Sequence, residues 1–134
     1  MPSTKGVRRA MSRTVMMQNT VQGYTFKLSF DRGDVVAGTP VVGTIMVTDA
    51  GENPVKDIEP VMGSFVSVLG FFADDVKTAV YIYAMGEPPL TSYDRAGPEL
   101  KFYMDPERRG FMKLFVQVKI QGETVVVPFG IDVK

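Results

Sequence analysis

The residue types that carry most enzyme chemistry are missing from this chain of 134 residues. It contains no histidine and no cysteine, which excludes Ser-His-Asp and Cys-His catalysis, thiolate chemistry, disulfides and the ordinary zinc and blue-copper sites. The neighbouring acids Asp74 and Asp75 could serve acid–base chemistry, but they lie in an expected hairpin turn, where both carboxylates face water. Because no nucleophile is paired with a base, we predict that the protein is not an enzyme.

Methionine is the soft metal ligand that remains. The chain has 9 methionines, whose thioether sulfurs suit Cu(I), although methionine also fills irregular gaps in apolar cores. No Walker loop or dinucleotide-binding glycine motif is present, so nothing favours a nucleotide. We therefore predict no cofactor, with copper held by methionines as the alternative.

The elements that would position these residues are β-strands. Tyr24–Phe30 alternates apolar and polar residues, as a half-buried strand does. Turn residues separate it from six further apolar runs, which are Val41–Thr48, Met62–Phe72, Thr78–Met85, Glu99–Met104, Phe111–Ile120 and Thr124–Val133. Short strands at this spacing, without a helical stripe, predict an all-β fold, an antiparallel two-sheet immunoglobulin-like sandwich of about seven strands. Pro128 predicts an edge or a bulge for the last strand.

The N-terminal residues differ in charge from the rest. Residues 1–20 contain four basic residues (Lys5, Arg8, Arg9 and Arg13) and no acid, so the remaining residues carry 15 − 4 = 11 basic and 15 acidic side chains. We predict a basic arm over residues 1–22, extended or disordered, and a sandwich domain over residues 23–134. Either the arm is a disordered terminus, or its strand-compatible residues, among them Val15 and Met16, add to a sheet edge of a neighbouring copy. The arm is followed by no apolar run of signal-peptide or membrane-span length.

Several short motifs are shared with a known family. They are Tyr24-Thr25-Phe26-Lys27-Leu28, Pro60-Val61-Met62-Gly63, Gly110-Phe111-Met112-Lys113-Leu114 and Val127-Pro128-Phe129. From Tyr24 to Val133 the layout resembles the YtkA-like/FixH-like group of exported β-sandwich domains, some of which are described as heavy-metal or copper binding. The resemblance implies a periplasmic or extracellular location. It also places four methionines near the metal region of the family, and these are our candidate metal ligands: Met62, Met85, Met104 and Met112.

Relatives of that group usually carry histidines at positions whose equivalents here are aromatic, namely Phe65, Tyr81, Tyr83 and Tyr103. A phenyl ring cannot ligate a metal, and a neutral phenol is a poor ligand. We interpret these residues as an aromatic cluster on adjacent strands, together with Phe71, Phe72 and Phe102. Such a cluster is either ordinary cross-strand packing or a surface that docks on another protein.

The sequence therefore predicts a non-enzymatic structural or protein-interaction subunit that self-associates or joins a larger assembly. The predicted contacts are the arm, through Arg8, Arg9, Arg13, Val15 and Met16, and the aromatic face, through Phe65, Tyr81, Tyr83 and Tyr103. The alternative is a copper-binding module. Balanced charge, with 15 basic and 15 acidic residues, favours neither nucleic acid nor a membrane surface as the partner.

Overall fold

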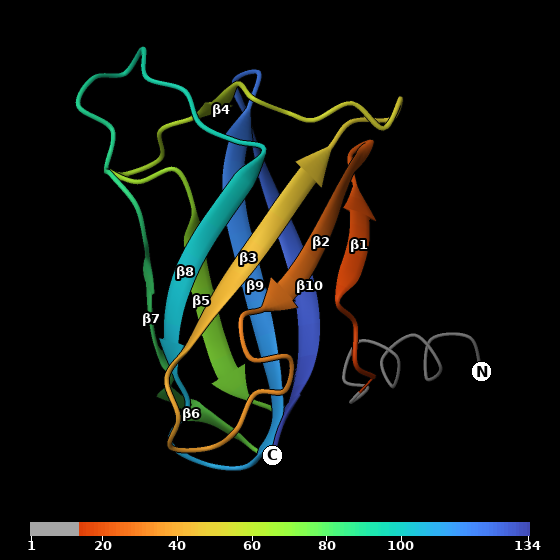
Figure 1. Cartoon of the computed structure of the whole chain (residues 1–134), viewed down its shortest axis with the longest axis vertical. Coiled ribbons are helices and arrows are strands. Elements are labelled where there is room, and N and C mark those ends of the chain that lie inside the picture. Colours follow the sequence, from red (N-terminus) through yellow and green to blue (C-terminus); the bar gives the residue numbers. More distant parts are fainter. Residues whose placement is uncertain (1–13) are drawn as a thin grey trace.

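The computed structural model describes residues 14–134, which form two antiparallel sheets packed face to face (Figure 1). One sheet, here the β3 sheet, contains β1 (Gln18–Val21), β2 (Tyr24–Phe30), β3 (Val41–Thr48), β8 (Glu99–Asp105) and β7 (Tyr81–Ala84), in that order. The other, the β9 sheet, contains β10 (Glu123–Val133), β9 (Gly110–Ile120), β5 (Ser67–Phe72) and β6 (Asp75–Ala79), and β4 (Ile58–Glu59) also pairs with β9. The predicted β-sandwich is confirmed. No helix in the described residues is long and apolar enough to cross a membrane.

Alternation along the strands builds the core. In β3 the buried positions are Val41, Gly43, Ile45 and Val47, and the residues between them are partly exposed. The long strand β9 repeats this pattern, with Val116, Val118 and Ile120 facing inward as the sequence predicts. Because successive side chains of a strand point to opposite faces, each sheet presents one apolar face. These faces meet over the largest fully buried rings, those of Phe26, Phe102 and Phe129.

Two predicted strands are corrected by the structure. The run from Met62 is not strand from its start, because Met62 and Gly63 have positive φ angles of 50° and 82° and form a tight turn; β5 begins only at Ser67. The run Thr78–Met85 is two strands that belong to different sheets, β6 and β7, with Val80 between them. A continuous apolar run does not reveal such a change of sheet, because both halves have strand periodicity.

The N-terminal segment also contacts both sheets, on the side of the sandwich that lies opposite β6 and β7. Met16 exchanges backbone hydrogen bonds with Gly130 of β10, at 2.7 and 3.1 Å, and a few residues later β1 pairs with β2 in the other sheet. The Asn19 side chain also donates to the Pro128 carbonyl, at 3.0 Å. Residues assigned from sequence to the arm thus belong to the sandwich from Met16 onward, and β10 lies at an edge of its sheet, as Pro128 predicts.

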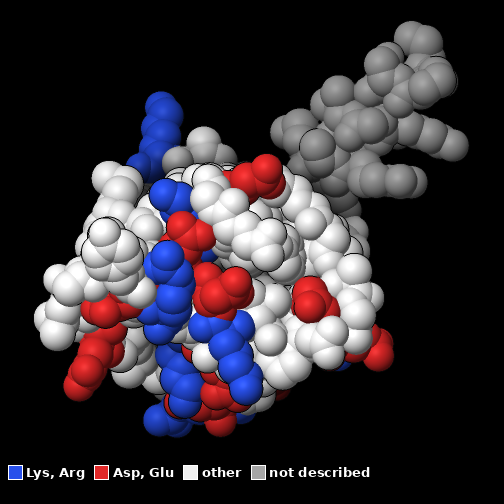
Figure 2. Space-filling model, turned by 90° about the horizontal axis from the view of Figure 1, so that it is seen from above, with Lys and Arg blue, Asp and Glu red and all other residues white. Residues whose placement is uncertain are grey.

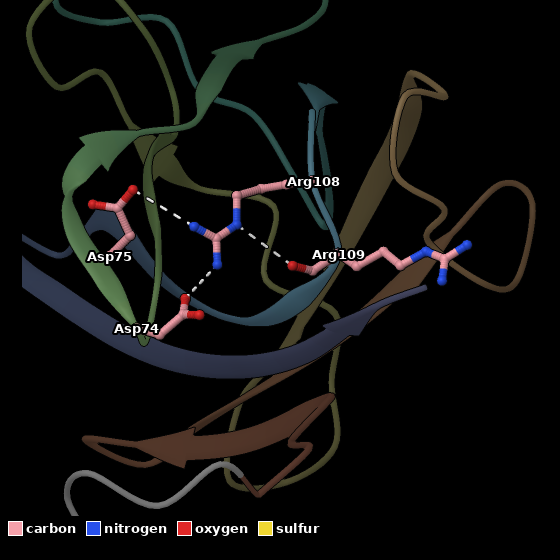
Figure 3. Close-up of polar contacts among 4 residues, drawn as sticks. All are labelled: Asp74, Asp75, Arg108 and Arg109. Carbon is pink, nitrogen blue, oxygen red and sulfur yellow. Dashed lines mark hydrogen bonds and ion pairs between the residues drawn. The ribbon is translucent and has the colours of Figure 1, made fainter.

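An arginine connects two loops at the lower end of the molecule (Figure 3). Arg108 Nη2 lies 2.6 Å from Asp74 Oδ1 and Nη1 lies 3.6 Å from Asp75 Oδ2, while the guanidinium carbon is 4.7 Å from the centroid of the Phe72 ring. The predicted turn at Asp74 is confirmed. The expectation that both carboxylates face water is incomplete, because both also form ion pairs with Arg108, which is distant in sequence.

Candidate functional site: the β7 surface

Three tyrosines gather on the outer face of the β3 sheet. Strand register places Tyr83 opposite Tyr103, and their rings stack at 4.8 Å with an interplanar angle of 21°. Tyr81 packs edge-on against both rings, at 5.4 Å from Tyr83 and 6.5 Å from Tyr103. Tyr81 and Tyr83 are 66% and 46% exposed. The predicted cluster of these three residues is confirmed, and it lies at the surface on β8 and β7, the latter being the last strand of its sheet.

The other aromatic residues predicted to join this cluster are placed elsewhere. Phe71 lies on the outer face of the β9 sheet, where its ring stacks on Phe115 at 5.8 Å. Phe72 and Phe102 are buried in the core. Neighbouring residues of one strand point to opposite faces, so Phe71 and Phe72 could not both join the tyrosines. Phe65 is partly buried and packs against the edge of the core.

Two open grooves lie along β7. The larger, of about 650 Å³, is lined by apolar residues that include Phe65, Met85 and Leu100, and by the charged residues Glu87, Glu99 and Lys101. The smaller, of about 320 Å³, lies between the β7 residues Ile82–Ala84 and the segment from Val61 to Val68. The grooves share Ser64, Val66 and Ala84 as lining residues. We call the three tyrosines, the two grooves and the edge of β7 the β7 surface.

A strained turn presents a methionine beside the smaller groove. Val61 and Ser64 exchange backbone hydrogen bonds of 2.6 and 3.0 Å around Met62-Gly63. Positive φ at both central residues marks a type I′ turn, which favours Asn or Gly over a residue such as Met. Met62 nevertheless occupies the first position and is 99% exposed. Strained backbone positions cluster at functional sites, so this turn marks the margin of the groove as a candidate contact.

The loop that follows β7 is ordered by its own polar side chains. Asp94 Oδ2 accepts backbone N–H groups of Leu90 and Thr91, at 2.7 and 3.1 Å. The hydrogen bond from Leu90, followed by that from Thr91, lowers the pKa of Asp94 below its ordinary value. This loop holds Leu90 and Tyr93 outward, at 89% and 86% exposure.

Burial and a nearby acid act on the central tyrosine. Desolvation is the main cause that raises the pKa of Tyr103 above its ordinary value, and the negative charge of Asp105 adds to it. Tyr103 is therefore a neutral phenol at physiological pH. It offers one O–H donor and an aromatic face, which suits recognition rather than proton transfer.

The four candidate metal ligands are not gathered into one site. Met104 and Met112 have no exposed surface and pack in the hydrophobic core. Met62 and Met85 are exposed, and each lines one of the two adjoining grooves. Within residues 14–134, no group of three or more Asp or Glu side chains is arranged to hold a metal ion. The grooves bring Met62 and Met85 to the same side of the fold as the tyrosines, which strand periodicity alone does not predict.

The arm residues divide between described and undescribed parts of the chain. Arg8, Arg9 and Arg13 lie outside the described residues. Val15 and Met16 are 53% and 40% exposed, and Met16 is bound to β10 of its own chain. At the upper end of the sandwich, basic and acidic side chains alternate in one band beside a broad area of other residues (Figure 2). The described surface in that view has no patch of a single sign.

Similarity to solved structures concerns the fold alone. A putative lipoprotein from Bacillus anthracis is 12% identical, with a TM-score of 0.49 over 96% of this chain and 91% of that one. A conjugative transposon lipoprotein from Bacteroides eggerthii is 14% identical, with a TM-score of 0.45 over 83% and 98% of the two chains. The filamin domain of Lin-41 is 13% identical, with a TM-score of 0.43 over 80% and 91%.

No curated protein matches the chain. The more specific resemblance to the YtkA-like/FixH-like group is not confirmed and stays a prediction, as does the location that it implies. A family model covers residues 19–134, a range that begins within β1 and includes the whole β7 surface. The chain belongs to that family, which is described as a domain of unknown function, DUF8832.

Proposed function

We propose that this domain is a non-enzymatic protein-interaction module that binds through its β7 surface. The observation that carries the proposal is the surface cluster of Tyr81, Tyr83 and Tyr103 at the end of a sheet, in which Tyr81 and Tyr83 are exposed. Tyrosine is enriched in binding hot spots, because it brings a large contact area and a hydroxyl at a low cost in side-chain entropy. Ring stacking fixes the side chains before binding, which lowers that cost further.

The surroundings of the tyrosines support the same role. The lining of the larger groove is more apolar than polar, and Met62 projects fully into water at the margin of the smaller one. Burying these groups against a partner removes apolar surface from water, which is favourable by about 25 cal/mol of free energy per Å². The N-terminal arm is the weaker candidate for this contact, since Met16 already pairs with Gly130 in its own chain. From the sequence resemblance we further propose a periplasmic or extracellular location.

Site-specific photo-cross-linking tests the proposal. A photoreactive phenylalanine analogue replaces Tyr81 in the producing cells, and a matched variant carries it at Ser29, which is exposed on the outer face of the same sheet. We expect a discrete covalent adduct from position 81 and none from position 29. Equal adducts from both positions, or none from either, would contradict the proposal.

Copper binding by exposed methionines is the alternative function. Its support is the placement of Met62 and Met85 in adjoining grooves. Native mass spectrometry after loading with Cu(I) tests it, with Met62→Leu/Met85→Leu as the variant and Met104→Leu as the matched control from the core. Loss of bound copper in the double variant alone would support a site, and equal copper content in all proteins would eliminate it.

A further inference from the structure

Within residues 14–134 the sandwich has four sheet edges, and three of them are protected against pairing with another chain. The β10 edge is occupied by Met16 and carries Pro128. The β1 edge faces β10, where Asn19 donates to the Pro128 carbonyl. The β6 edge carries Lys77 and an irregular register with β5. Charges, prolines and irregular pairing are the usual means of blocking an edge.

The β7 edge has none of these features. Its residues Tyr81–Ala84 are uncharged and contain no proline, and its register with β8 is regular. Met85 donates its N–H to the Lys101 carbonyl of β8 at 2.9 Å. In an antiparallel pair alternate residues face the same neighbour, so Tyr81 and Tyr83 also direct their backbone groups to β8. The N–H and C=O groups of Ile82 and Ala84 therefore point away from the sheet, toward the smaller groove that these residues line.

We propose that β7 pairs in antiparallel fashion with β7 of a second copy of this chain, about a twofold axis at Tyr83. This proposal rests on the proposed function and names its partner. Ile82 of one copy then lies opposite Ala84 of the other, so both N–H and both C=O groups of each edge are satisfied. The two β3 sheets become one continuous sheet.

A backbone group already in use excludes one alternative register. A twofold axis at Ile82 would need Val80 opposite Ala84, but the Val80 N–H already donates to Gly70 O in the β9 sheet, at 3.2 Å. An axis at Tyr83 uses only the free groups of Ile82 and Ala84. Of these two registers, only the one about Tyr83 leaves the Val80–Gly70 hydrogen bond intact.

The side chains favour a second copy as the occupant because the edge is complementary to itself. On the inner face, the large Ile82 meets the small Ala84. On the outer face, Tyr83 meets its own equivalent, which extends the Tyr83–Tyr103 stack of each copy across the axis. Aromatic cross-strand pairs of this kind stabilise sheets.

The flanking groups are complementary as well. Tyr81 of one copy lies opposite Met85 of the other, beside the larger groove that Met85 lines, and a thioether next to an aromatic ring is a favourable contact. Beyond them in the same row, register with β8 places Asp105 behind Tyr81, and the Met85–Lys101 hydrogen bond places Lys101 behind Met85. Each such row across the joined sheet therefore has Asp105 of one copy at one end and Lys101 of the other copy at the other end, so like charges do not face each other.

Single-cysteine cross-linking tests the pairing, since the chain has no cysteine of its own. Tyr83→Cys places two thiols in a non-hydrogen-bonded pair with Cα atoms about 4.5 Å apart, within the range of about 4.4–6.8 Å that a disulfide spans. Tyr81→Cys is the matched control from the same strand, because its two copies are separated by about 14 Å along the strand. Ser29→Cys is the control from the same outer face.

We expect Tyr83→Cys to form disulfide-linked dimer under mild oxidation with a yield about tenfold above either control. An equimolar mixture of Tyr81→Cys and Met85→Cys should give the heterodimer. Comparable yields for all single variants, or a higher yield for Tyr81→Cys than for Tyr83→Cys, would overturn the proposal.

Sedimentation equilibrium gives a measurement without a new thiol. Ala84→Pro removes an N–H that points to the second copy and leaves the hydrogen bonds between β7 and β8 intact, whereas Ala84→Ser keeps the N–H. Because the twofold axis repeats the loss, we expect Ala84→Pro to raise the dimer dissociation constant roughly ten- to a hundredfold, with Ala84→Ser close to the unmodified protein. Circular dichroism confirms folding. Equal dissociation constants for the two variants, or an unmodified protein that stays monomeric, would refute the pairing.

These results separate the two proposals. If Tyr83→Cys gives no excess of dimer while a photoreactive residue at Tyr81 captures a different protein, pairing between copies fails and the interaction role stands. If neither experiment gives a product specific to the β7 surface, both proposals fail.

Discussion

Replacing Gly43 by alanine should destabilise the sandwich at the strand pair that positions Tyr103. Gly43 lies in β3 opposite Phe102 of β8. A Cβ atom at Gly43 would lie less than 3.0 Å from three ring carbons of Phe102. Ordinary carbon contacts are about 3.5–4.0 Å, so the ring must move by more than roughly 1 Å. The ring is fully buried and packs edge-on against Phe30 at 6.2 Å, so any movement must displace core neighbours.

The cost follows from this geometry. Overpacking of a dense core costs about 1–3 kcal/mol, and the rigid ring places Gly43→Ala at the upper end of that range. For a domain of this size, we expect the melting temperature to fall by roughly 6–15 °C. Thermal and urea unfolding, followed by circular dichroism, measure both quantities. Thr44→Ala, at the neighbouring partly exposed position, is the matched control and should change stability by less than about 1 kcal/mol.

A second substitution tests the cause. Phe102→Leu removes the ring carbons that meet the new Cβ, so Gly43→Ala should cost less in that background than in the unmodified protein. The expected coupling free energy is at least about 1 kcal/mol. Additive effects, or a Gly43→Ala protein as stable as the unmodified one, would show that contact with the Phe102 ring does not limit this position.

Three further predictions concern polar groups. Arg108→Met should lower the free energy of unfolding by only about 1 kcal/mol, because the ion pairs of Arg108 are partly exposed and its contact with the Phe72 ring adds little. The side chain of Arg109 points away from Asp74 and Asp75 (Figure 3), so Arg109→Met should leave the free energy of unfolding unchanged. Urea titration distinguishes the two variants. An NMR titration of Asp94 should give a midpoint below its unfolded-state pKa. Since the native pKa is the lower one, the hydrogen bonds of Asp94 stabilise its loop above the unfolded pKa, and this contribution is lost as the pH falls through the native pKa; a midpoint at or above the unfolded value would contradict these bonds. Asp105→Asn should bring the pKa of Tyr103 down only part of the way, because desolvation is the larger cause; a complete return, seen by NMR of labelled tyrosine, would contradict the role of burial.

Local sequence pattern was sufficient for the fold class. Alternation in Tyr24–Phe30 and Phe111–Ile120 identifies strands with one buried face, and Pro128 indicates an edge. These features depend on side-chain period and on the missing N–H of proline, which are properties of a few consecutive residues. The absence of histidine and cysteine limited the possible chemistry in the same direct way.

The candidate site could be predicted only in part. The sequence indicated that Tyr81, Tyr83 and Tyr103 form a cluster, because register across an antiparallel pair brings residues on the same face together. It did not show that this cluster lies on a free edge. That depends on the change of sheet at Val80, which a continuous apolar run conceals. The glycine after Met62 was a turn signal that the strand prediction did not use.

The composition and periodicity of the sequence by themselves determined a β-sandwich without histidine or cysteine. The tertiary structure decided which strand edges are covered, where Met62 and Met85 lie relative to the tyrosines, and how Arg108 neutralises Asp74. Contacts of this kind join residues that are far apart in the chain, and their existence depends on strand order and on which face each strand presents. Local propensity specifies neither strand order nor the face that a strand presents, because it is set by residues a few positions apart. A sheet edge, by contrast, exists only where no further strand pairs.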